Sequence, residues 1–195
     1  TKKPNPRTRV GRQRLRRRLR PHVRQKLMNS PITVLEASEE DKERVFELHC
    51  KLFHDEIEDR WGWDEQWQKE NFSKEWKRDD FEVVKHKDLV IGYLQFSTES
   101  DHIYLHNIAL DSDFQGKGLG SYLLERIIKK AQNLCAAVEL SVHPRNKVAL
   151  KLYEKFDFEV IRSEPKTYLM RLNNKSLTRQ VCGIARRSAP SNPTL

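Results

Sequence analysis

The sequence lacks a long apolar run. Of its 195 residues, 37% are hydrophobic and 33% are charged, and no apolar stretch approaches the ~20 residues that span a bilayer. No apolar segment follows the basic start, as it would in a secretory signal. We therefore expect no membrane partner, and the length predicts one well-buried domain with little left for a second.

Cysteine is scarce as well. Cys50, Cys135 and Cys182 are odd in number, widely spaced and in no Cys-x-x-Cys pair. This pattern indicates neither a disulfide framework nor a zinc site. We therefore expect no bound metal and a reducing, cytoplasmic location.

Acidic residues are absent from both ends of the chain. The net charge of +9 arises because residues 1–26 hold 12 Lys and Arg and residues 173–195 hold 4, with no acid in either segment. The other 21 basic residues stand against all 28 acidic ones, which gives the middle a net charge of −7. We predict a basic disordered arm at 1–27, a folded domain at 28–172 and a disordered basic tail at 173–195.

The basic arm allows two rival interpretations: a nucleic-acid-binding arm, and an organelle transit peptide, which usually carries more serine. The acidic body would repel phosphates, so nucleic acid is expected as a partner only through the arm, if at all. Met28 directly precedes the first folded-looking element, and residues 1–27 are therefore expected to lie outside the natural protein.

Hydrophobic periodicity predicts the elements of the folded part. Helices are expected to open at Ser38, Asp64, Leu119 and Asn146. Strands are expected at 32–35, 81–85, 89–97, 102–110, 137–142, 159–162 and 167–172. Strands and helices alternate only after residue 110, so we predict an α/β (α+β) fold with a mixed, mostly antiparallel twisted sheet and helices on both faces.

A polar turn at 111–120, Asp-Ser-Asp-Phe-Gln-Gly-Lys-Gly-Leu-Gly, joins a predicted strand to a predicted helix. Its three glycines allow positive φ and let backbone N–H groups approach a ligand, and the helix points its positive end into the turn. With Lys117 as a mobile positive charge, the turn predicts a pyrophosphate site and an anionic, nucleotide-like cofactor. The alternative is a loop that merely needs glycine.

Gln115-x-x-Gly118-x-Gly120 between strand and helix resembles the Gln/Arg-x-x-Gly-x-Gly/Ala signature of the GNAT superfamily of N-acetyltransferases. The resemblance covers about residues 32–172, and its most specific part runs from Asn107 to Phe158. It implies acetyl-coenzyme A (acetyl-CoA) as co-substrate. It also implies that the strand before the loop and the strand after its helix run parallel and splay apart, so that free backbone groups bind the pantetheine arm.

By this resemblance, one set of residues would hold the cofactor: Ile108, Ala109, Leu110, Gln115, Gly116, Lys117, Gly118, Leu119, Gly120, Ser121, Asn146 and Tyr153. Asp157 stands where the family commonly has glycine, which puts the turn geometry at that point in doubt.

Acetyl transfer to an amine needs a neutral amine, donors for the oxyanion and a proton for the leaving thiolate. The resemblance makes Tyr153 the acid, since a phenol of pKa about 10 stays protonated at neutral pH; the alternative is a core aromatic.

No general base is clearly marked. Tyr104 and Ser141 stand where histone acetyltransferases and ribosomal-protein acetyltransferases, respectively, have a Glu, which argues against those two classes of acceptor. Glu139 is the tentative base, with His106, His143 and the acids of 55–65 also left open.

The stretch 53–67 is both acidic and aromatic. The resemblance places it beside the acceptor, where carboxylates and indole faces would attract a cationic amine. The tentative acceptor residues are Glu56, Asp59, Trp61, Trp63 and His106. The alternative is a solvated acidic helix followed by buried tryptophans. The partner expected is thus a small-molecule or peptide amine; a homodimer and a non-catalytic coenzyme A-binding module are left open.

Overall fold

The computed structural model describes residues 32–173, apart from the side chain of Arg60. The basic arm, the suspected start at Met28 and residues 174–195 of the tail lie outside the described residues. The predicted domain boundaries therefore stay predictions.

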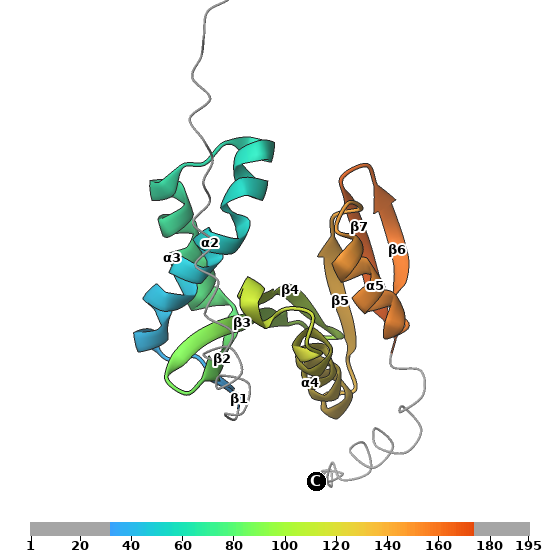
Figure 1. The fold of residues 1–195 in the computed structure, drawn as a ribbon. Coiled ribbons are helices and arrows are strands. Elements are labelled where there is room, and N and C mark those ends of the chain that lie inside the picture. Colours follow the sequence, from blue (N-terminus) through green and yellow to red (C-terminus); the bar gives the residue numbers. More distant parts are fainter. Residues whose placement is uncertain (1–31, 174–195) are drawn as a thin grey trace, which may run out of the picture. The chain divides into compact units, whose positions relative to one another are not determined.

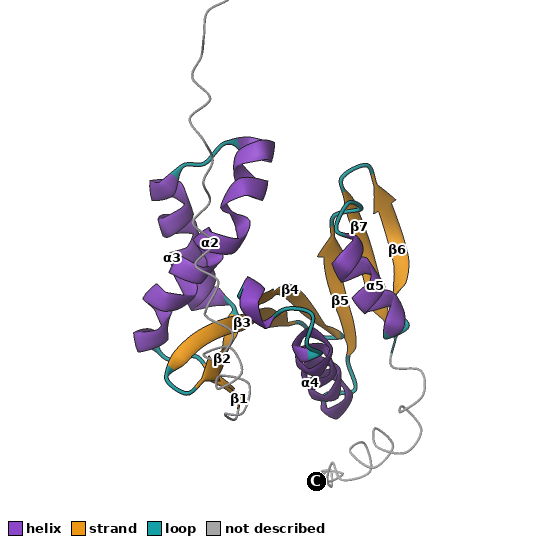
Figure 2. Cartoon of the chain, viewed as in Figure 1, coloured by secondary structure: helices purple, strands orange, loops and turns teal. Residues whose placement is uncertain are grey.

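The described residues form a seven-stranded sheet in the order β1-β2-β3-β4-β5-β7-β6 (Figures 1 and 2). Only the β4–β5 pair is parallel; all other neighbours are antiparallel. The strands are β1 Ile32–Glu36, β2 Asp80–His86, β3 Leu89–Thr98, β4 His102–Leu110, β5 Ala137–Val142, β6 Glu159–Glu164 and β7 Thr167–Leu172. The predicted mixed, mostly antiparallel sheet is confirmed.

Four α-helices connect these strands: α2 Lys42–Trp61, α3 Glu65–Arg78, α4 Leu119–Asn133 and α5 Lys147–Lys155. A short 3-10 turn, Glu39–Asp41, precedes α2, and the N–H of Ser38 donates to the carboxylate of Asp41 there (3.1 Å). Gly62, at φ +80°, ends α2. The acidic stretch from Phe53 to Trp61 is therefore the last part of one long helix.

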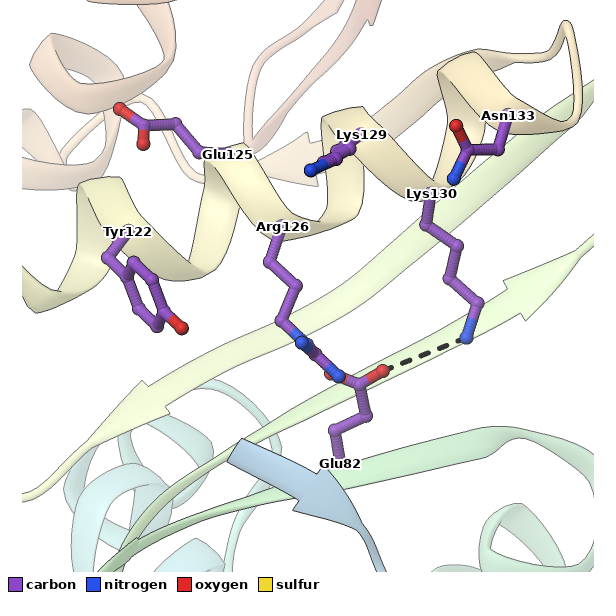
Figure 3. A pocket seen from close by; sticks show the side chains of 7 residues that line it. All are labelled: Glu82, Tyr122, Glu125, Arg126, Lys129, Lys130 and Asn133. Atoms are coloured by element: carbon purple, nitrogen blue, oxygen red, sulfur yellow. Dashed lines mark hydrogen bonds and ion pairs between the residues drawn. The ribbon is translucent and has the colours of Figure 1, made fainter. Parts of the chain in front are cut away.

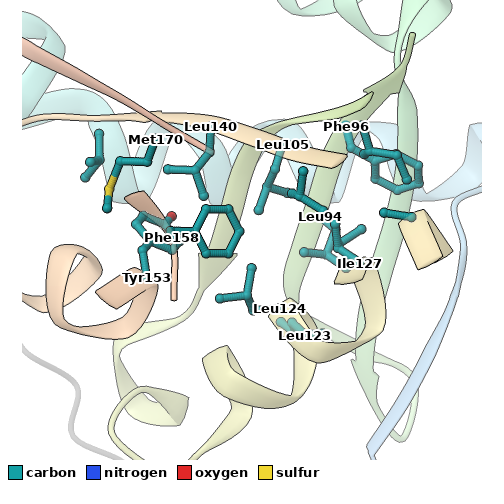
Figure 4. Close-up of a cluster of buried hydrophobic side chains, with 14 of the residues drawn as sticks. Leu94, Phe96, Leu105, Leu123, Leu124, Ile127, Leu140, Tyr153, Phe158 and Met170 are labelled. Atoms are coloured by element: carbon teal, nitrogen blue, oxygen red, sulfur yellow. The ribbon is translucent and has the colours of Figure 1, made fainter. Parts of the chain in front are cut away.

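The two faces of the sheet carry separate cores, because successive side chains of a strand point to opposite sides. On β2, Val83 packs with α2 and α3, whereas the next residue, Val84, packs in the core that contains α4 and α5. Tyr93 and Leu94 divide in the same way on β3. Figure 4 shows the second core, in which Leu123, Leu124 and Ile127 of α4 lie among side chains of the central strands.

Helices thus cover both faces, as predicted. α4 carries the long apolar stripe that covers one side of the central strands, and Trp76 with Phe72 anchors α3 on the other. None of the helices in residues 32–173 is both long and apolar enough to cross a bilayer.

Two local features differ from the sequence expectations. Asp157 takes φ +61°, the left-handed conformation that the family's glycine would adopt, so the turn keeps its shape without glycine. Cys50 is a free thiol, but Cys135 is disulfide-bonded, which the spacing of the cysteines did not indicate.

His86, at the end of β2, is a buried polar side chain without a partner. It is 1% exposed, and neither ring nitrogen has a hydrogen-bond partner among the described residues. Its ring lies beside that of Phe114, with centroids 5.9 Å apart. A buried polar group in this position lowers stability, because folding removes its hydration and supplies no replacement bond.

We expect His86→Leu to raise the free energy of unfolding by about 1–2 kcal/mol, since it removes an unpaired buried polar group at similar volume. Urea unfolding followed by circular dichroism measures the change. The control is His54→Leu on the exposed side of α2, which should change stability by less than about 0.5 kcal/mol. A less stable His86→Leu chain would show that the imidazole makes a bond that the structure does not record.

Candidate active site

The candidate site begins where β4 and β5 stop pairing. Their parallel register runs from His102 opposite Ala137 to Leu105 opposite Leu140 and ends there. Beyond that point β4 remains paired with β3 as far as Leu110, and β5 remains paired with β7 as far as Val142. The two strands therefore separate at their carboxyl ends, which is the splay that the family resemblance implied.

The separation leaves backbone groups of β4 facing the gap. The N–H of Asp111 donates to the carbonyl of Ile91 on β3 (2.8 Å). Because backbone groups alternate in direction along a strand, those of Leu110 and Ile108 point to the opposite side, where β5 has left the sheet. The carbonyl of Leu110 accepts a hydrogen bond from Gln115 Nε2 (2.8 Å), so Gln115 fixes the end of the strand.

The glycine-rich turn lies directly beyond this strand. Gly116 and Gly118 adopt φ of +71° and +83°, and Gly118 is the N-cap of α4. A Cβ atom built at either position meets no atom within 4 Å, so both residues border open space and are needed for their backbone conformation. The positive end of a 15-residue helix thus opens onto an uncrowded turn, which suits a pyrophosphate.

Lys117 differs from the expectation of a mobile charge. Its Nζ donates to the carbonyl of Asp113 (2.6 Å) and lies over the ring of Phe114, 5.2 Å from the centroid. The ammonium group is therefore fixed beside the turn. Gly120, in contrast to the other two glycines, has ordinary helical φ, and a Cβ there would contact Leu152 at 3.5 Å.

A cavity of about 360 Å³ lies at the splayed strands. Residues of five elements and their loops line it: His49, Phe53, Glu56, Ile57, Trp61, His106, Asn107, Ile108, Ser141, Val142, His143, Asn146, Ala149, Tyr153, Lys166 and Thr167. The fold thus brings the predicted acid, the backbone of Ile108 and much of the predicted acceptor wall to one place. Neither Glu139 nor Trp63 is among the lining residues.

Tyr153 lies near the end of α5 and is 9% exposed. Its ring packs against that of Phe158, with centroids 5.7 Å apart, as Figure 4 shows. Burial raises the pKa of Tyr153 to about 12. The residue is therefore both a core aromatic and a cavity residue, and its hydroxyl stays protonated at neutral pH. At the other end of α5, Asn146 Oδ1 caps the helix by accepting from the N–H of Ala149 (3.1 Å).

Glu139, the tentative base, lies in an ion-pair cluster. Its carboxylate accepts from Arg171 Nη1 (2.5 Å), and Arg171 also pairs with Asp101 (3.3 Å). His102 Nε2 is 3.7 Å from the second oxygen of Glu139. Sequence gave no sign of this cluster, because Arg171 reaches Glu139 from a strand 32 residues further along the chain.

Three histidines line the cavity, and His49 and His106 each contact another side chain. His49 Nδ1 is 2.8 Å from the hydroxyl of Tyr93, and burial lowers the pKa of His49 to about 4. His106 Nε2 is 3.0 Å from Ser97 Oγ and 3.8 Å from a carboxylate oxygen of Asp79. Sequence reasoning missed His49, which stands on an ordinary amphipathic helix; the one available signal was a histidine on the apolar side of that helix.

The acidic end of α2 borders a second, larger cavity of about 840 Å³, which shares Glu56, His143, Asn146 and Lys166 with the first. Asp55, Glu56 and Asp59 line one side of it, and Arg145 and Lys166 also contribute. Trp61 is 73% exposed at the edge of the first cavity. Trp63 packs on His54 instead, with ring centroids 4.5 Å apart, so these two tryptophans do not converge on one ligand.

A third cavity, of about 530 Å³, lies against α4 (Figure 3). Its lining consists of Glu82, Tyr122, Glu125, Arg126, Lys129, Lys130 and Asn133. Arg126 and Lys130 both pair with Glu82, and Lys130 covers the ring of Phe96. None of the residues predicted for the site lies there. Residues 32–173 hold no group of three or more His, Cys, Asp or Glu that could bind a metal ion.

A family model for the acetyltransferase (GNAT) family matches residues 42–158, which is more than half of the chain. This chain belongs to the GNAT family. The resemblance inferred from the glycine turn is thereby confirmed, and the matched range contains the turn and the whole stretch from Asn107 to Phe158.

Two curated relatives match a shorter stretch. A probable spermine N(1)-acetyltransferase of Bacillus subtilis subsp. natto is 32% identical over 63 residues, which are 31% of this chain and 41% of that protein. The alanine N-acetyltransferase of ribosomal protein bS18 from Salmonella typhimurium is 41% identical over 59 residues, 30% of this chain and 40% of that protein. The chain thus matches less than half the length of either relative.

Solved structures agree over a longer range. The PaiA N-acetyltransferase of Thermoplasma acidophilum, crystallised with coenzyme A, superposes with a TM-score of 0.62 at 21% identity. The match covers 73% of this chain and 99% of that one. This likeness supports the GNAT fold described above.

We expect Gly118→Val to abolish the rise in melting temperature that acetyl-CoA should give, because the side chain would occupy the open space over the turn. Thermal unfolding with and without acetyl-CoA measures the effect. Gly62→Val is the control, since Gly62 also has φ near +80° and open space around it; its ψ is 152°, against −8° at Gly118. Both variants should lose about 1–3 kcal/mol from backbone strain. If only Gly118→Val loses the acetyl-CoA shift, the turn is the binding site; equal shifts in both variants would contradict it.

Proposed function

We propose that this chain is an N-acetyltransferase that transfers the acetyl group of acetyl-CoA directly to a primary amine of a small cationic molecule or peptide. The observation that carries the proposal is the free end of β4 beside the glycine turn. Ile108 and Leu110 offer backbone groups there, and Tyr153 lines the adjoining cavity. Acetyl-CoA turnover across polyamines, amino acids, aminoglycosides and peptides tests it.

The residues present fit acetyl-CoA. Gly116, Gly118 and the N–H groups at the start of α4 would hold the pyrophosphate, with Lys117 beside them. Leu119, Gly120 and Ser121 complete that turn, and Gln115 holds Leu110 in place. The backbone of Ile108, Ala109 and Leu110 would orient the pantetheine arm and the acetyl group. Acetyl-CoA supplies an acyl thioester, and N–H groups aimed at the carbonyl oxygen would stabilise the oxyanion.

Tyr153 would act at the departing sulfur. Its pKa of about 12 lies well above the ~8.5 of a free thiol. Full transfer of the proton to a thiolate is therefore uphill, and the main effect is a charge-assisted hydrogen bond that stabilises the thiolate. Asn146 would support this geometry indirectly, because its cap fixes the start of the helix that carries Tyr153.

The acceptor proposal depends on the end of α2. Glu56, which lines both cavities, and Asp59 bring negative charge to the approach to Ile108, and Trp61 presents an exposed indole at its edge. Carboxylates attract ammonium groups, and an indole face adds cation–π attraction of about 0.5–2 kcal/mol. The matched B. subtilis relative is named a spermine acetyltransferase, which is the class of acceptor that this wall suits.

A non-catalytic coenzyme A-binding module is the second candidate, and absence of turnover with every amine would favour it. Nucleic acid binding by the arm and a homodimer stay predictions. The cytoplasmic location also stays a prediction. Fractionation of cells that make the full chain tests that location.

We expect Tyr153→Phe to lower kcat by about 10- to 100-fold, because it deletes a hydrogen bond to a developing charge worth about 1.5–3 kcal/mol. The ring and its contact with Phe158 remain, so affinity for acetyl-CoA should hardly change. Steady-state kinetics and thermal shifts give both quantities. The control is Tyr122→Phe on the exposed side of α4. Wild-type kcat in Tyr153→Phe would leave Tyr153 as a core residue only.

We expect the paired change Glu56→Gln and Asp59→Asn to raise KM for spermine more than it lowers kcat, because these carboxylates bind and do not react. In the unaltered chain, kcat/KM for spermine should fall as salt rises, since ions screen the attraction. The paired change Glu40→Gln and Glu43→Gln, in the 3-10 turn before α2 and in the first turn of α2, removes the same charge as a control. An unaltered KM for spermine in the Glu56→Gln and Asp59→Asn variant would mean that these carboxylates are merely solvated surface groups.

A further inference from the structure

His106 stands at an irregularity of β4. The β3–β4 register changes from Gln95 opposite Asn107 to Phe96 opposite Leu105, so His106 is an extra residue without a partner on β3. Such a bulge re-aims a side chain and is common beside active sites. Here the bulge falls within the part of β4 that β5 has left, and His106 lines the cavity.

A buried carboxylate lies behind the imidazole. Asp79 follows the last residue of α3, and its side chain is fully buried. Arg78 donates to both of its oxygens (2.7 and 3.0 Å), and Gln95 Nε2 donates to Oδ2 (2.7 Å). The same Oδ2 is 3.8 Å from His106 Nε2, and Ser97 Oγ is 3.0 Å from that nitrogen.

We propose that His106 is the general base of the reaction and that Asp79, with Ser97, is a positioning residue that sets its tautomer. The inference rests on the proposed function. The negative charge of Asp79 near Nε2 favours a proton on that nitrogen, where Ser97 Oγ can accept its hydrogen bond. Nδ1 then keeps a lone pair, which is what a base in this cavity needs.

The proton balance is complete without a further reactant. His106 Nδ1 takes one proton from the acceptor ammonium, directly or through one water, and becomes an imidazolium. The amine nitrogen forms a bond to the acetyl carbon, the carbon–sulfur bond breaks, and the sulfur leaves with the electron pair, hydrogen-bonded by Tyr153. After the bond to the acetyl carbon has formed, the nitrogen still carries one proton more than an amide holds, and this proton goes to the thiolate. His106 finally releases its proton to solvent.

Several charges act on His106. Burial lowers the pKa of His106 below 6.5, Asp79 opposes this shift and Arg78 adds to it. Farther groups that also act on the ring or line the same cavity are Glu75, Glu99, Tyr104, His49, Glu56, His143 and Lys166. A lowered pKa means that His106 is neutral at pH 7 and ready to accept a proton.

The other candidates in the cavity fit the role less well. His143 Nδ1 already accepts from the N–H of Arg145 (3.1 Å). His49 Nδ1 is engaged with Tyr93, and a pKa of about 4 makes it a weak base at neutral pH. Glu139 is ion-paired with Arg171 and does not line the cavity.

The test is the pH dependence of kcat/KM for spermine, or for the fastest amine of the panel, in the full chain. The wild-type rate should rise with pH through the pKa of His106, below 6.5, and then level off. In His106→Gln, kcat/KM should fall about 100-fold and should no longer rise with pH. Asp79→Asn should lose about 10-fold and move the rise to lower pH, because the carboxylate no longer raises the pKa of the imidazole. A structural role alone would leave the rise in place.

His102→Gln on the same strand is the control, because His102 also pairs with an aspartate but lies outside the cavity. Acetyl-CoA thermal shifts establish that each variant is folded, and addition of free imidazole to His106→Ala should restore part of the rate. If the chain is active but neither His106→Gln nor Asp79→Asn alters its pH profile, the roles of His106 and Asp79 are overturned and the proposed function stands. If the wild-type chain binds acetyl-CoA but acetylates no amine, the proposed function is overturned, and the roles of His106 and Asp79 with it.

Discussion

The site depends on the loss of pairing between β4 and β5 after Leu105 and Leu140. Unpaired backbone in a buried sheet is costly unless a ligand or water satisfies it. The splay persists because each strand keeps its other neighbour, β3 for β4 and β7 for β5. It leaves Ile108 and Leu110 with the hydrogen-bonding pattern of a strand edge, so a ligand of extended shape can complete the sheet there.

The same separation makes room for the chemistry. α2 reaches the gap from one side and α5 from the other, so acidic groups near Glu56 and the hydroxyl of Tyr153 meet at a cavity that a continuous sheet would fill. Polar groups are graded by burial. The Asp79 carboxylate is fully buried and lies 3.8 Å from the half-buried His106, whereas the carboxylates at the end of α2 are exposed beside the larger cavity, where they can attract an amine.

Sequence predicted the elements that have local signals. The glycine turn, the capped start of α5 and the apolar stripe of α4 each give a signal within about ten to fifteen residues, and with them the GNAT fold could be predicted. Contacts between distant residues could not. Arg171 neutralises Glu139, Asp79 approaches His106, and His49 reaches Tyr93 only after the sheet has formed. Charge pairing and tautomers depend on such contacts, so the sequence left the general base open among Glu139, His106, His143 and the acids of 55–65.

Amide hydrogen exchange along β4 tests the central claim most directly. The N–H groups of Ile108 and Leu110 should exchange more slowly once acetyl-CoA is added, because a bound pantetheine arm would take the place of β5. The N–H of Ala109 points toward β3 and should change little, which provides a control within the same strand. Unchanged exchange of Ile108 and Leu110 at saturating acetyl-CoA would contradict the account.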